Sequence, residues 1–123
     1  MIGTQCIPQD QWLAYFNDMS RRYRGWGVTI EVARLDLGNQ PAAVGLPLQG
    51  FSFEPRGSAA GDILIEAGDD PGEFFIHQVD GPEAVRVTET QIGVEAALQI
   101  ESTDGTKTLV LLRRLPALPP AMA

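Results

Sequence analysis

The chain has 123 residues and a formal net charge of -7, with 44% hydrophobic and 20% charged residues. This length suits a single domain, and this composition is too apolar for a disordered chain. No stretch approaches the roughly 18 continuous apolar residues of a membrane-spanning helix, and the first ten residues, MIGTQCIPQD, lack the basic and apolar regions of a secretory signal. We therefore expect a soluble, cytoplasmic protein with no membrane partner.

Residues 9–24, QDQWLAYFNDMSRRYR, have the periodicity of an amphipathic helix, with large apolar side chains at intervals of four, three and four residues. Asp18 stands three and four residues before Arg21 and Arg22, a spacing that stabilises helices. Gly25 follows the last periodic residue, where helices commonly end. The predicted buried stripe consists of Trp12, Phe16, Met19 and Tyr23, widened by Leu13 and Tyr15.

The end of this helix, SRRYRGWG, concentrates basic and aromatic residues in an acidic chain. Arginines in a last helical turn interact favourably with the free carbonyls there, so the stretch is explained as a helix end. Guanidinium groups beside aromatic rings also suit phosphate or carboxylate, which leaves an anion or ligand site as the alternative. The candidate ligand-binding residues of this stretch are Arg21, Arg22, Arg24 and Trp26.

After Gly27 the periodicity changes from helical to alternating, and it stays so to the end of the chain. Pro47 and Gly50 predict that the second strand is an edge or kinked strand. Asp104-Gly105 is the strongest hairpin signal. The segments that predict strands are 27–32, 44–55, 62–67, 73–79, 83–90, 94–102 and 106–114.

Short connections and the absence of further helices predict an α+β fold. One N-terminal amphipathic helix packs on a curved, mostly antiparallel meander sheet of about six or seven strands, with a partly closed barrel as the alternative. We expect residues 1–114 to form a single domain. The tail, residues 115–123, is rich in proline and alanine and should be extended or disordered.

Residues that carry chemistry are few. His77 is the only histidine and Cys6 the only cysteine, which excludes an internal disulfide and a zinc site built from these residue types. A half-buried structural histidine on the strand FFIHQV is the simplest interpretation, and His77 is also a candidate ligand-binding residue. The acidic segment GDDPGE resembles a tight turn more than a calcium loop. We therefore predict no metal, no cofactor and no catalytic residues.

Four segments taken in order, IPQDQW, SRRYRGWGVTIEV, GDDPGEFFIH and IESTDGTKTLVLLR, resemble a family of small bacterial proteins of unknown function. The resemblance spans roughly residues 7–114 and ends before the proline-rich tail. It implies a bacterial origin, and no site residues can be carried over from it.

Eleven acidic residues against one basic residue between positions 62 and 104 argue against nucleic-acid binding, although such charges also serve solubility. We expect a non-catalytic binding or interaction domain, with a homo-oligomer or a protein as partner. The alternative is a small-molecule or anion-binding protein, or a carboxylate-dependent enzyme, with its site between the helix end and the sheet.

Overall fold

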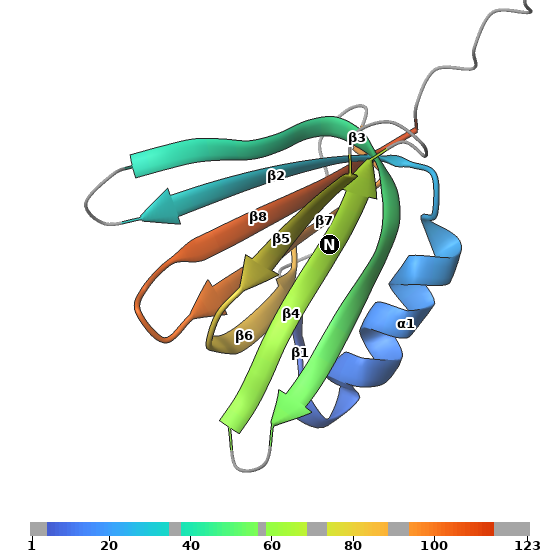
Figure 1. Ribbon diagram of the computed structural model, residues 1–123. Coiled ribbons are helices and arrows are strands. Elements are labelled where there is room, and N and C mark those ends of the chain that lie inside the picture. The colour runs from blue at the N-terminus through green and yellow to red at the C-terminus, as the bar shows by residue number, and fades with distance from the viewer. Residues whose placement is uncertain (1–4, 35–37, 57–58, 69–73, 89–93, 115–123) are drawn as a thin grey trace, which may run out of the picture.

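The computed structural model describes residues 5–34, 38–56, 59–68, 74–88 and 94–114. In these ranges the chain forms a 3-10 helix, η1, an α-helix, α1, and eight strands (Figure 1). The elements are β1 (Gln5–Ile7), η1 (Gln9–Gln11), α1 (Trp12–Arg22), β2 (Gly27–Arg34), β3 (Gly38–Arg56), β4 (Ala59–Gly68), β5 (Phe74–Val79), β6 (Pro82–Val87), β7 (Ala96–Ser102) and β8 (Lys107–Arg113).

All eight strands belong to one antiparallel sheet in the order β1-β6-β7-β8-β2-β3-β4-β5, which confirms the α+β class. Two meanders, β2 to β5 and β6 to β8, are joined where β8 pairs with β2. The sheet is rolled but not closed into a barrel, since β1 and β5 remain its edges. The number of strands exceeds the predicted six or seven because Gln5–Ile7 forms an additional strand, which is too short to show a periodicity in the sequence.

Strand β3 is bent and lies between β2 and β4 in the sheet. The kink predicted from Pro47 is therefore confirmed, and the prediction of an edge position is wrong. Residues 38–47 pair with β2, and from Leu48 onward the strand pairs with β4. The change of partner falls at Pro47, which has no N–H to donate and is tolerated where a ladder is interrupted. The adjacent N–H of Leu48 donates to the carbonyl of Trp26 at 2.7 Å.

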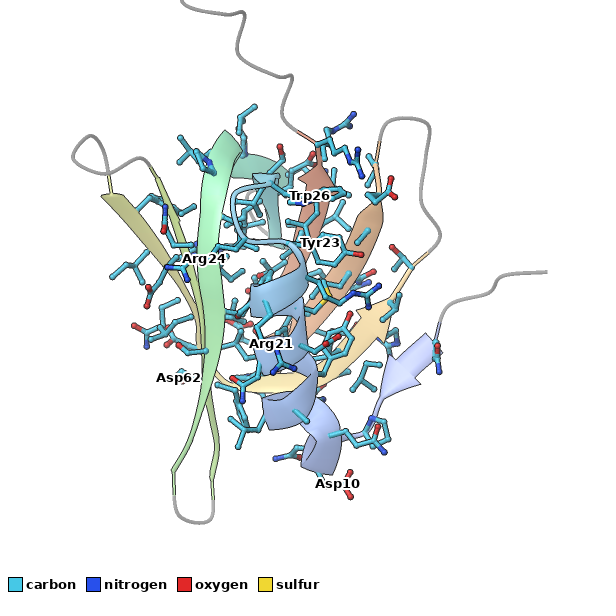
Figure 2. All side chains as sticks on the ribbon, turned by 90° about the vertical axis from the view of Figure 1, so that its right-hand side faces the viewer. Asp10, Arg21, Tyr23, Arg24, Trp26 and Asp62 are labelled. Carbon is cyan, nitrogen blue, oxygen red and sulfur yellow. The ribbon has the colours of Figure 1, made fainter. Side chains whose placement is uncertain are left out.

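Helix α1 lies over the open side of the rolled sheet, between β3 and β1 (Figure 2). Ser20 Oγ accepts a hydrogen bond from the N–H of Phe51 on β3 at 2.8 Å. Trp12 Nε1 donates to the carbonyl of Ile7 on β1 at 2.9 Å. The two bonds attach the helix to strands that lie far apart in the sheet order, so α1 closes the core that the sheet leaves open.

The predicted stripe of the helix is confirmed for its central members. Trp12, Phe16 and Met19 are buried and belong to the same core as the strands, while Tyr15 and Tyr23 are partly buried against it. Leu13 is half exposed, so its place in the stripe was wrong. The helix presents a narrower face to β3 than the sequence predicts.

Several predicted features lie outside the described residues: the tail 115–123 and the acidic turn around 69–73. In the ranges that are described, no helix has the length and apolar character needed to cross a membrane.

Candidate functional site: a polar mouth

The interior of the rolled sheet changes from apolar to polar toward one end. On β2 the inward positions run from Val28 and Ile30, both fully buried, through half-buried Val32 to exposed Arg34. Alternation alone keeps these four side chains on one face of the strand. A charged residue therefore occupies the fourth position of a series that begins in the core.

The same change occurs on β7 and β8. Inward Ile100 is followed by Ser102, and inward Val110 is preceded by Thr108. Ser102 and Thr108 are 4% and 1% exposed, and they are the buried polar residues of the described chain. Hydroxyl groups thus border the apolar core on the side that faces Arg34.

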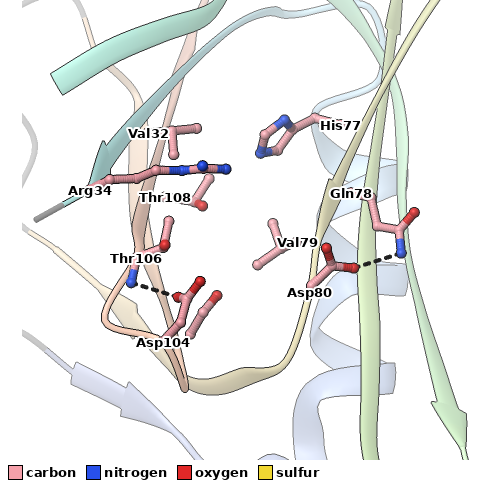
Figure 3. Close-up of a pocket in the computed structure, with 10 residues that line it drawn as sticks. Val32, Arg34, His77, Gln78, Val79, Asp80, Asp104, Thr106 and Thr108 are labelled. Carbon is pink, nitrogen blue, oxygen red and sulfur yellow. Dashed lines mark hydrogen bonds between the residues drawn. The ribbon is translucent and has the colours of Figure 1, made fainter. Parts of the chain in front are cut away.

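Two adjoining cavities occupy this end, with volumes of about 70 and about 200 Å³. They share Val32, Arg34 and His77 as lining residues, and we call the two together the polar mouth (Figure 3). Both are smaller than the roughly 300–1,000 Å³ of pockets for drug-sized ligands. The lining side chains able to bind polar groups include Arg34, His77, Asp80, Asp104, Thr106 and Thr108.

His77 reaches the mouth through the register of β4 and β5. It stands opposite Ile65, which is fully buried, so its ring lies on the inward face of the sheet. Burial, assisted by the positive charge of Arg34 and opposed by Asp80, lowers the pKa of His77 below its ordinary 6.5. Near neutral pH the ring is therefore uncharged, with one nitrogen to donate and one to accept.

The guanidinium of Arg34 points into the mouth from the end of β2 (Figure 3). Within the described residues, no carboxylate lies within the 4.0 Å ion-pair distance of this guanidinium. A guanidinium presents five donors in a planar fork that fits carboxylate and phosphate. Arg34 is thus the group of the mouth best suited to hold an anion.

Asp80 and Asp104 also line the smaller cavity of the mouth, and in Figure 3 the carboxylate of Asp80 is turned toward Gln78. Asp80 accepts a hydrogen bond from Gln78 Nε2 at 2.8 Å. Asp104 accepts one from the N–H of Thr106 at 2.9 Å. Hydrogen bonds from Thr106, helped by the charge of Arg34, lower the pKa of Asp104. The Asp104 carboxylate is therefore ionised near neutral pH.

These groups can bind a small polar ligand, and they are not arranged as a nucleophile and its base. In the part of the chain that the structure describes, the His77 ring makes no hydrogen bond to a hydroxyl or thiol, as an activated nucleophile requires. A general acid needs a raised pKa, whereas that of Asp104 is lowered.

The residues predicted at the helix end lie elsewhere. Arg21 and Arg22 approach Asp18 at 3.7 and 3.6 Å, and Arg24 is exposed. Trp26 packs edge-on against Tyr23, with ring centroids 5.0 Å apart (Figure 2). Neither cavity of the mouth is lined by these residues. Of the predicted site residues, only His77 belongs to the mouth.

Sequence reasoning missed Arg34, Asp80, Asp104 and Thr106. A signal for Arg34 was present, because it continues the inward series of β2 with a charge where an apolar residue is expected. The aspartates gave no such signal, since each also fits an ordinary turn. Their convergence depends on the pairing of strands that are distant in sequence.

No group of three or more His, Cys, Asp or Glu side chains in the described ranges is placed to hold a metal ion. The acidic turn that offered the weak calcium alternative is outside those ranges.

Comparison with known proteins gives a family and no activity. A model of a family of unknown function (DUF5335) matches residues 3–121. An uncharacterised protein of Aquifex aeolicus is 28% identical over 122 residues, covering 96% of this chain and 97% of the relative. No solved structure matches the chain.

Proposed function

The chain belongs to the DUF5335 family of unknown function, and we propose that it is a non-catalytic binding domain that holds a small anionic ligand in the polar mouth. The proposal keeps the predicted binding role and moves its site. The ligand lies at the end of the rolled sheet beside Arg34 and His77, rather than between the helix end and the sheet.

The observation that carries the proposal is the state of Arg34. Its guanidinium points into a cavity, and no carboxylate of the described residues pairs with it. By contrast, Arg86 pairs with Glu101 at 2.7 Å, and Arg21 and Arg22 both approach Asp18. A carboxylate or phosphate oxygen would satisfy the guanidinium through two parallel N–H bonds. His77 lines the same cavity and supplies a neutral donor.

A thermal-denaturation series tests this site. Sodium acetate and sodium phosphate should raise the melting temperature above that in sodium chloride of equal ionic strength, because a ligand that binds only the native state stabilises it. Arg34→Gln should reduce that gain to the general effect of these salts on protein surfaces. Arg113→Gln is the matched control, since it removes an exposed charge that does not line the mouth. Equal gains in wild type and Arg34→Gln would contradict the proposal.

We propose that Arg21, Arg22 and Arg24 complete α1 and do not form a second anion site. The pairing of the first two with Asp18, and the left-handed conformation of Gly25 at φ 86°, support this interpretation. Trp26 then serves to cover the helix end together with Tyr23.

For a protein partner, we propose self-association through the free edge of β5. Within the described sheet β5 pairs only with β4, and its sequence FFIHQV carries none of the lysines or prolines that protect edge strands. Ile76 on this strand is 52% exposed. Light scattering should give the mass of a dimer that Ile76→Lys converts to a monomer, and a monomeric wild type would contradict the proposal.

We also propose a cytoplasmic location. The exposed free thiol of Cys6 is compatible with a reducing compartment. Fractionation of the source cells tests it, and recovery outside the cytoplasm would contradict it.

A further inference from the structure

The polar mouth holds charges of both signs that do not pair with one another. Arg34 enters from β2, while Asp80 follows β5 and Asp104 lies in the turn between β7 and β8. All three residues line the same cavity (Figure 3). Neither carboxylate comes within 4.0 Å of the guanidinium. The site therefore has a positive side and a negative side with a space between them.

The carboxylates are held apart from Arg34 by contacts of their own. Gln78 Nε2 donates to Asp80 at 2.8 Å and also to Asp62 at 3.0 Å, so it attaches Asp80 to β4. The N–H of Thr106 fixes Asp104 inside its turn at 2.9 Å. Such contacts keep the two negative groups in position before a ligand arrives, which lowers the entropy cost of binding.

The uncharged parts of the mouth limit the size of a ligand. Val32 and Val79 contribute apolar surface to the lining, and Thr106 and Thr108 contribute hydroxyls. Cavities of about 70 and about 200 Å³ hold a few heavy atoms each. A ligand that reaches both charged sides must therefore be short.

We propose that the ligand of the polar mouth is a small zwitterion, whose carboxylate binds Arg34 and His77 and whose ammonium group binds Asp80 and Asp104. Complementary charges on both sides of a site give selectivity against ligands that carry only one of them. The proposal rests on the proposed function, which requires the anionic half of the ligand alone.

Calorimetric titration with five probes at equal ionic strength tests it: acetate, methylammonium, glycine, β-alanine and 4-aminobutanoate. The three zwitterions differ in the separation of their charges, so one of them should fit best. We expect the best zwitterion to bind at least about tenfold more tightly than acetate, which corresponds to about 1.4 kcal/mol. Methylammonium should also bind more weakly than the best zwitterion, because it has no carboxylate for Arg34 to bind.

Variants of the two aspartates distinguish the zwitterion preference from the binding of an anion alone. In Asp80→Asn, and in the double variant with Asp104→Asn, the preference for the zwitterion should fall to about twofold or less while acetate binding persists. Asp10→Asn is the matched control, since Asp10 is exposed near the start of the helix and does not line the mouth (Figure 2).

Acetate and zwitterions that bind wild type equally would overturn this inference and leave the proposed anion site intact. A zwitterion preference that survives loss of both aspartates would also overturn it. Binding of none of the carboxylate probes would overturn both proposals.

Discussion

The imidazole of His77 lies parallel to the ring of Phe75, with centroids 6.3 Å apart and an angle of 9° between the planes. His77 lines both cavities of the polar mouth, and its side chain is partly removed from water. Arg34 approaches the mouth from β2. Both burial and the neighbouring positive charge disfavour the imidazolium form.

The stability of the fold should depend on pH through His77. Its pKa is lowered in the folded state, so below pH 6.5 the unfolded chain binds more protons than the folded one. The contribution of neutral His77 is therefore complete above pH 6.5 and is lost as the pH falls through the folded pKa. Urea denaturation between pH 5 and 7.5 should show a stability difference between wild type and His77→Gln that shrinks toward pH 5. A difference that stays constant would contradict the buried, neutral imidazole.

The helix should be part of the core. Phe16 is fully buried and its ring lies 5.5 Å from that of Phe51 on β3. Phe16→Ala should lower the free energy of unfolding by about 3–5 kcal/mol. Leu13→Ala is the control on the same helix, because Leu13 is half exposed and its loss should cost less than about 1 kcal/mol. A Phe16 variant as stable as the Leu13 variant would mean that α1 is only loosely attached.

The arginines at the end of α1 should stabilise the helix end and should not bind an anion. Sulfate stabilises most proteins by exclusion from their surfaces, so wild type and the triple variant Arg21→Gln, Arg22→Gln, Arg24→Gln must be compared at equal ionic strength. We expect equal gains, and a loss of about 1 kcal/mol or less per arginine from the missing interactions with the helix carbonyls. A gain in wild type alone, by more than about 1 kcal/mol, would reveal a bound anion.

Divalent metals should not contribute to stability. The described residues contain no group placed to hold one, and the acidic segment GDDPGE lacks the spacing of a calcium loop. Dialysis against EDTA should leave the melting temperature unchanged. A fall of many degrees that added calcium reverses would point instead to Asp69, Asp70 and Glu73.

The sequence predicted those features of the fold that depend on residues close to one another along the chain. Intervals of three and four residues identified Trp12, Phe16 and Met19 as buried, and Asp104-Gly105 marked the turn between β7 and β8, where Gly105 has φ 88°. The two-sided pairing of β3 could not be predicted, because a proline in a strand is equally compatible with an edge. Only the pairing of β3 with both β2 and β4 decides that point.

The polar mouth was harder to predict for a similar reason. Arg34 and His77 are 43 positions apart in the sequence and lie on strands separated by two others in the sheet. They meet because the sheet curves and brings β2 and β5 to the same cavity. Arg34 is a local indication of the site in the sequence. It is a charged residue that follows Val32 in an otherwise apolar series of inward positions.

Nuclear magnetic resonance of His77 tests the anion site most directly, because the chain has a single histidine and its imidazole signals need no assignment. The pKa of His77 is measured in sodium chloride and again in saturating sodium acetate at the same ionic strength. A carboxylate bound between Arg34 and His77 favours the imidazolium form, so acetate should raise the pKa of His77. The same salt should leave it unchanged in Arg34→Gln. A pKa in wild type that acetate does not move would show that acetate does not bind beside His77 and would contradict the proposed anion site.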